Sequence, residues 1–73
     1  MRIGIDVRSR DAAQLVRQLR THKKVQSAEL GDVYFIDPAW RQVLVETDMT
    51  MEEVDDWLWK RTNVEYAGFW EVT

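Results

Sequence analysis

The chain has 73 residues, 45% of them hydrophobic, no cysteine and a formal net charge of −3. This length allows one domain, residues 1–73, and the absence of cysteine excludes disulfides and thiolate metal sites. No apolar run approaches the ~20 residues of a membrane span, and the opening MRIGIDVRSRD has no signal-peptide apolar block. We therefore expect a soluble, cytoplasmic protein that has no contact with membranes.

The charges are divided unevenly along the chain. Residues 1–24 contain seven Lys or Arg and two acids, a balance of +5, whereas residues 25–73 contain three Lys or Arg and eleven acids, a balance of −8. The two balances sum to the net charge of −3. This division predicts either an interaction face or a fold in which the two halves neutralise each other.

A strand and a helix are expected first. Apolar and polar residues alternate over MRIGIDV, which is the period of a strand with one buried face. In RDAAQLVRQLRTH the apolar residues recur at the i, i+3, i+4 and i+7 spacing of one helical face, and Ser9 precedes them as a suitable N-cap. The stripe consists of Ala12, Leu15, Val16 and Leu19.

A hairpin is expected in the middle of the chain. The segment VQSAELGDVYFI is typical of extended chain, with an interruption at Gly31-Asp32 that is either a bulge or a two-residue turn. Pro38 fixes one backbone dihedral and cannot donate to a ladder, so DPAWR is the stronger turn signal. We therefore place the tip at Asp37 to Arg41, followed by a strand at QVLVET. A turn at Gly31-Asp32 would instead create a fifth strand.

The stretch TMEEVDDWLWKR predicts a second helix, before a last strand at VEYAGFWEV. Thr50 and Glu53 have the spacing of a capping box. Because a helix turns by about 100° per residue, Trp57 and Trp59 cannot both face one core, and Trp59 lies about 140° from Val54. The expected buried stripe is Met51, Val54, Trp57 and Leu58.

The order strand, helix, strand, strand, helix, strand favours a compact split βαβ arrangement, since helix-connected strands require right-handed crossovers. This order, with the segment IDPAWRQVLVETDMTMEEVDDWL, resembles the ferredoxin-like superfold. The resemblance implies an α+β sandwich with a four-stranded antiparallel sheet and two helices on one face. It indicates no specific family, because the C-x-x-C of heavy-metal-associated domains and the sheet aromatics of RNA-recognition motifs are missing from the first strand region.

Catalysis and metal binding are not expected. His22 is the only histidine, and a carboxylate cluster on a helix points in several directions instead of forming a cage. The three glycines are isolated, so no phosphate-binding loop is present. We predict a protein that is not an enzyme and that has no cofactor, metal or catalytic residue.

A tryptophan beside carboxylates favours a protein-binding function, since Trp is enriched among interface hot spots. We expect a non-catalytic module, possessing an acidic face that is steered to a basic, nucleic-acid-binding surface of a partner. By analogy, small, acidic, cysteine-free proteins of this kind are typical of virus-encoded inhibitors of host defence. The alternative that Trp59 packs against the fold stays open. The expected face consists of Trp59, Glu46, Asp48, Glu52, Glu53, Asp55 and Asp56, with Trp40 as a second candidate anchor.

Three alternatives remain from the sequence. A nucleic-acid binder would use a basic first helix, with Trp40 and Phe69 or Trp70 stacking on bases. A small-ligand regulatory module would bind at a dimer interface. A homodimer would pair two open sheet faces through Tyr34 or Phe35, Leu44, and Phe69 or Trp70. The cations of the nucleic-acid alternative are Arg8, Arg10, Arg17, Arg20, Lys23 and Lys24.

Overall fold

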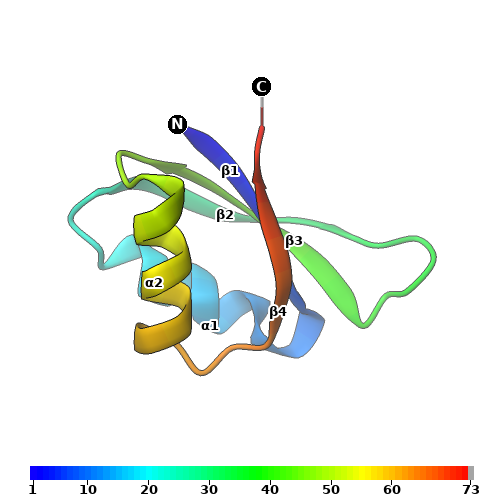
Figure 1. The fold of residues 1–73 in the computed structure, drawn as a ribbon. Helices are drawn as coiled ribbons and strands as arrows, with labels where there is room; N and C mark the ends of the chain where they lie inside the picture. The colour runs from blue at the N-terminus through cyan, green and yellow to red at the C-terminus, as the bar shows by residue number, and fades with distance from the viewer. Residues whose placement is uncertain (73) are drawn as a thin grey trace.

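A computed structural model describes residues 1–72 of the protein. Its strands form one antiparallel sheet in the order β2-β3-β1-β4, and both helices lie on one face of it (Figure 1). This arrangement confirms the expected ferredoxin-like α+β sandwich. The elements are β1 (Arg2–Arg8), α1 (Ser9–Arg20), β2 (Val25–Val33), β3 (Trp40–Thr47), α2 (Met51–Arg61) and β4 (Tyr66–Glu71).

The core lies between the sheet and the helices. β1 is central, and its alternation places Ile3, Ile5 and Val7 toward the helices with almost no exposed surface. The i, i+3, i+4, i+7 stripe of α1 is buried as expected. On α2, Val54 and Leu58 are buried, and Met51 and Trp57 pack partly buried against the same core.

The two helices begin differently. In α2 the predicted capping box is confirmed, because the Thr50 hydroxyl accepts from the Glu53 amide and the Glu53 carboxylate accepts from the Thr50 amide, each at 3.1 Å. The predicted Ser9 N-cap is wrong. Arg8 occupies the cap position without a side-chain bond, and Ser9 is the first helical residue. Its hydroxyl donates instead to the Pro38 carbonyl at 2.6 Å, so the β2–β3 hairpin has taken the group that would have capped the helix.

Of the two interpretations of Gly31-Asp32, a bulge or a two-residue turn that would create a fifth strand, the structure shows the bulge. Gly31 lies inside β2, where the register with β3 shifts between Leu30 and Val33. The expected tip at Asp37 to Arg41 extends too far, because β3 already begins at Trp40. The Asp37 carboxylate accepts from the Ala39 amide at 3.1 Å, which places the tight turn immediately after Asp37 and returns the chain to the sheet by Trp40.

Within residues 1–72, none of the helices has the length and apolar character that crossing a membrane requires.

Candidate protein-binding interface

The two tryptophans of α2 have different environments. Trp57 packs partly buried against the core, and its ring meets the His22 imidazole edge-on with centroids 5.8 Å apart. Trp59 is 77% exposed. The packing alternative for Trp59 is therefore excluded. The cause is helix geometry, because two residues two positions apart differ by about 200° around the axis.

The exposed Trp59 ring borders a shallow, open hollow on α2, whose other lining residues are all acids. Their spacing over one and a half turns brings them to the outer surface of the helix, opposite the buried stripe. The structure thus gathers five of the residues that the sequence suggested for a partner-binding face. The lining residues are Glu52, Glu53, Asp55, Asp56 and Trp59.

These acids are not electrostatically equivalent. Lys24 donates to the Glu53 carboxylate at 2.7 Å, and this bond, together with the bond to the Thr50 amide, holds the pKa of Glu53 below its ordinary value. Asp56 pairs with Lys60 at 2.8 Å, one turn along the helix. Among residues 1–72, Glu52 makes no ion pair or side-chain hydrogen bond, and it therefore carries uncompensated charge.

Asp55 is the second acid of the hollow with uncompensated charge. It makes no ion pair within the described part of the chain, and it lies close enough to the Tyr66 hydroxyl to influence that group. Burial is the main cause that raises the pKa of Tyr66, and the charge of Asp55 raises it further.

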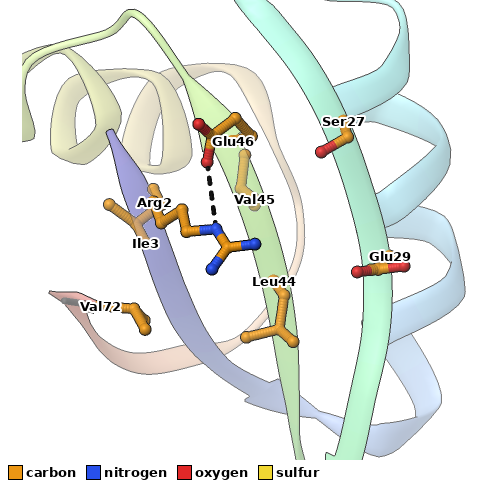
Figure 2. A pocket seen from close by; sticks show the side chains of 8 residues that line it. All are labelled: Arg2, Ile3, Ser27, Glu29, Leu44, Val45, Glu46 and Val72. Carbon is orange, nitrogen blue, oxygen red and sulfur yellow. Dashed lines mark ion pairs between the residues drawn. The ribbon is translucent and has the colours of Figure 1, made fainter.

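Three residues expected to bind the partner lie elsewhere, namely Glu46, Trp40 and Asp48. Val45 and Thr47 are buried against the helices, so Glu46 between them must point to the open face of the sheet. There its Oε2 atom lies 3.5 Å from the Arg2 guanidinium (Figure 2). Trp40 also lies on the open face, opposite Arg8 in the ladder, with the Arg8 guanidinium 4.4 Å from the ring centroid. Strand alternation in QVLVET was the signal that could have prevented the Glu46 assignment.

Asp48, which was also expected on the acidic face, follows β3 and is exposed. Its carboxylate accepts from the Gln26 side-chain amide at 2.9 Å, which ties the end of β3 to the start of β2. It does not line the hollow beside Trp59.

The six cations of the nucleic-acid alternative do not form a continuous free surface. Arg8 pairs with Glu65 and lowers the pKa of that carboxyl, mainly through their hydrogen bond. Arg20 donates to the Ala28 carbonyl at 3.0 Å, and Lys24 is bonded to Glu53. The other three, Arg10, Arg17 and Lys23, are exposed, and Arg10 lies 3.9 Å from the Asp11 carboxylate.

Of the aromatic residues proposed to stack on bases, Trp40 lies beside one of these cations, with the Arg8 guanidinium over its ring, on the open face of the sheet. Trp70 lies on the open face, since its ring covers Gly4 there, and Phe69 packs against the core. A nucleic acid on α1 would therefore not reach either ring, because the helices cover the opposite face of the sheet (Figure 1). The exposed cations of α1 and the rings on the open face therefore do not form one surface of cations and stacking platforms such as single-stranded binding uses.

A second hollow lies on the open face, and the ion pair between Arg2 and Glu46 crosses it (Figure 2). Its volume is about 250 Å³, which is below the roughly 300–1,000 Å³ of small-molecule sites. It contains both signs of charge, from Arg2, Glu46 and Glu29, beside the apolar Leu44. This mixture favours neither a dedicated ligand site nor the continuous apolar patch expected for a homodimer through the open face.

Metal chemistry has little support in the described residues. Within residues 1–72, no group of three or more His, Cys, Asp or Glu side chains is placed to hold a metal ion. The Nδ1 atom of His22 accepts from the Lys24 amide at 3.0 Å, so the imidazole contributes to the turn between α1 and β2.

Two residues of the hairpin are fully exposed, of which Phe35 was expected in an exposed patch only as an alternative to Tyr34, and Ile36 was not expected there. Phe35 and Ile36 are 101% and 95% exposed. The preceding Tyr34 turns inward and donates to Asp6 on β1; burial first, and this bond second, raise the pKa of its hydroxyl. The run YFI immediately before the Asp-Pro turn was the available signal, because three consecutive apolar side chains of extended chain cannot all point to one face of a sheet.

No protein-family model matches the chain, and no curated protein or solved structure matches it either. The geometry of the chain itself is therefore the basis for any statement about its function.

Proposed function

We propose that the protein is a non-catalytic binding module that docks the acidic face of α2 onto a basic surface of another protein, with Trp59 as the anchor. The observation that supports this proposal is the 77% exposed Trp59 ring at the border of a hollow otherwise lined by carboxylates. A tryptophan provides a large contact area with few rotatable bonds, which is why it is frequent among hot spots.

The charge arrangement suits rapid and selective encounter with cations. Glu52 and Asp55 are free to meet partner cations directly. The pairs of Glu53 with Lys24 and of Asp56 with Lys60 are solvent-exposed, and such surface pairs contribute little to stability. Exchanging them for arginines of a partner therefore costs little, and the summed negative field steers association.

The helix that carries the face is well fixed at both ends. The capping box holds its first turn, and the Thr62 hydroxyl donates to the Leu58 carbonyl at 2.7 Å in its last turn. A preorganised face loses less conformational entropy on binding than a flexible one. The module can therefore bind as a rigid body.

A basic surface on a protein is frequently a nucleic-acid-binding site. The carboxylates on the acidic face of α2 present negative charge to such a surface, as a phosphate backbone does. We therefore propose inhibition by occupancy as the mode of action, in which the partner loses access to its nucleic acid. An inhibitor of host defence encoded by a virus is one setting for this activity.

The proposal is tested by a nuclease-treated pull-down from native lysate, in which wild type is compared with Trp59→Ala and with the charge reversal of Glu52 and Asp55 to Lys. The matched controls are Phe35→Ala, which removes another exposed aromatic, and Glu71→Lys, which reverses an exposed acid on β4. We expect one partner to be retained by both controls and lost with both α2 variants.

The captured partner is then challenged with heparin and with duplex oligonucleotide. Displacement of the protein by either polyanion is expected if the partner surface is a nucleic-acid site. Retention of the partner by the Trp59→Ala and charge-reversed variants would overturn the proposal. Salt-sensitive binding of the protein itself to oligonucleotides, lost with Arg17→Glu, would favour the alternative that uses α1.

A further inference from the structure

A further hollow lies on the open face of the sheet, beside the hairpin and apart from the two hollows described above. Its volume is about 320 Å³, which falls within the roughly 300–1,000 Å³ of small-molecule sites. Two aromatic rings and two carboxylates from segments far apart in the sequence meet there. The lining residues are Asp6 on β1, Tyr34, Ile36 and Asp37 in the hairpin, Trp40 at the start of β3 and Ala67 on β4.

The sheet is uncovered at this place because the residues of β4 are small there. Asp6 alternates with the buried residues of β1 and therefore points to the open face. Its partner in the β1–β4 ladder is Gly68, where a Cβ atom would meet nothing within 4 Å. Two residues earlier on β1, by contrast, Gly4 is covered by the Trp70 ring. The neighbouring Gly68 and Ala67 thus leave the floor of the hollow open beside Asp6.

The aromatic walls of the hollow are held in place by hydrogen bonds. The Tyr34 hydroxyl donates to the Asp6 carboxylate, and the Tyr34 amide donates to the Trp40 carbonyl at 3.0 Å. The Trp40 amide in turn donates to the Asp37 carbonyl at 3.0 Å. The turn itself is fixed to α1 by Ser9, whose hydroxyl donates to one of its carbonyls. A site with walls fixed in this way loses little conformational entropy when a ligand binds.

The charged side chains that line the hollow are both acids, Asp6 and Asp37. Among residues 1–72, neither of them forms an ion pair. Arg8 lies outside the hollow, and its guanidinium is already paired with the Glu65 carboxylate. A cation that enters the hollow therefore meets two carboxylates whose charge no side chain of the described residues compensates.

The Trp40 ring already contacts one cation. The Arg8 guanidinium lies over it, 4.4 Å from the ring centroid, within the roughly 6 Å over which a cation is attracted to an aromatic face. Because Arg8 does not line the hollow, the part of the ring that faces the hollow is free for a second cation. Tyr34 adds another aromatic ring to the same hollow. Several rings around one cation are the arrangement that recognises quaternary ammonium groups.

We propose that this hollow binds the methylated ammonium group of an organic cation, with its methyl groups against Tyr34 and Trp40 and its charge toward Asp6. An unmethylated ammonium needs acceptors for three N–H groups, whereas Asp6 already accepts from the Tyr34 hydroxyl and Asp37 from the Ala39 amide. A trimethylammonium group has no N–H and requires only aromatic surface and negative charge. Such a group occurs on free cations such as choline and on methylated lysine side chains of proteins.

The test is an NMR titration that follows the Trp40 indole N–H and the Ala67 amide, with choline and with a peptide containing one trimethyllysine as probes. The controls are the neutral isostere of choline, in which carbon replaces the nitrogen, and NaCl at equal ionic strength. We expect saturable shifts of both signals with the charged probes and none with the controls. Tighter binding of the peptide than of choline assigns the site to a methylated protein, and equal or weaker binding assigns it to a free cation.

Substitutions test the residues that form the site. Trp40→Leu and Asp6→Asn are each expected to weaken binding of the charged probes about tenfold. Asp6→Asn removes the charge but keeps an oxygen that can accept from Tyr34, so it decides the question even if Trp40→Leu unfolds. The matched control, Trp59→Leu, removes an exposed ring outside the hollow and should leave binding unchanged. Equal shifts with choline and its neutral isostere, no shift with either charged probe, or unchanged binding by Asp6→Asn would overturn the proposal. None of these outcomes affects the function proposed for α2, because the hollow does not include Trp59.

Discussion

Gly4 has no room for a side chain, because the Trp70 ring lies directly over it on the open face. The two residues are partners in the β1–β4 ladder, and a Cβ atom built on Gly4 would lie 2.5 Å from Cζ2 of Trp70. Ordinary contact begins near 3.4 Å, so Gly4→Ala must displace the ring by about 1 Å. Overpacking of this kind costs about 2 kcal/mol, and removal of a strand glycine offsets about 0.5 kcal/mol of that.

We therefore expect Gly4→Ala to lower the free energy of unfolding by about 1.5 kcal/mol and Tm by about 6–12 °C. Urea and thermal unfolding followed by circular dichroism measure both. Gly68→Ala is the matched control, because a Cβ atom there meets nothing within 4 Å, and it should be neutral or slightly stabilising. In a Trp70→Ala background, Gly4→Ala should lose its penalty. Equal costs of Gly4→Ala in both backgrounds would refute the assigned contact.

Three further predictions concern the cap of α2, the ionisation of the Glu53 carboxyl in that cap, and the packing of the core. Thr50→Ala removes the capping bond to Glu53 and should cost about 1 kcal/mol, seen as a Tm lower by about 4–8 °C. Lys24 and the Thr50 amide hold the pKa of Glu53 below 4.5, so its stabilising contribution is complete above pH 4.5 and is lost as pH falls through the lowered value. An NMR titration of that carboxyl gives the pKa, and the stability advantage of wild type over Glu53→Gln should shrink in the same range. Leu15→Ala empties a fully buried site and should cost about 2–5 kcal/mol, measured by urea denaturation; a change below 1 kcal/mol would contradict its central position.

Periodicity was sufficient to predict the number, type and order of the elements. The strand alternation and the helical stripes survive in the structure because the same residues that define each period, such as Ile5 on β1 and Leu58 on α2, are buried in one core. The sequence left open whether Trp59 is exposed or packed, and the structure shows it exposed on the side of α2 away from the buried Val54.

The remaining features depend on tertiary contacts that periodicity does not contain. Ser9 looked like a cap because its local sequence suits one, but the hairpin at Pro38 competes for its hydroxyl. The end of the turn was misplaced because Asp37 closes it with its own side chain. The exposure of Phe35 and Ile36 depends on how far the hairpin extends beyond the helices, which is set by the register of β2 with β3.

The uneven charge distribution of the sequence is only partly neutralised by the fold. Among the described residues 1–72, three ion pairs join cations of residues 1–24 to later acids, namely Arg2 with Glu46, Arg8 with Glu65 and Lys24 with Glu53. Two of them lie on β1, so neutralisation is concentrated at the central strand and its neighbours. On α2, Lys24 reaches only the first turn and Lys60 only Asp56. Glu52 and Asp55 keep their charge beside an exposed tryptophan. A helix that needed these carboxylates only for solubility would gain nothing from placing Trp59 among them, and this is the physical reason to look for a basic partner there.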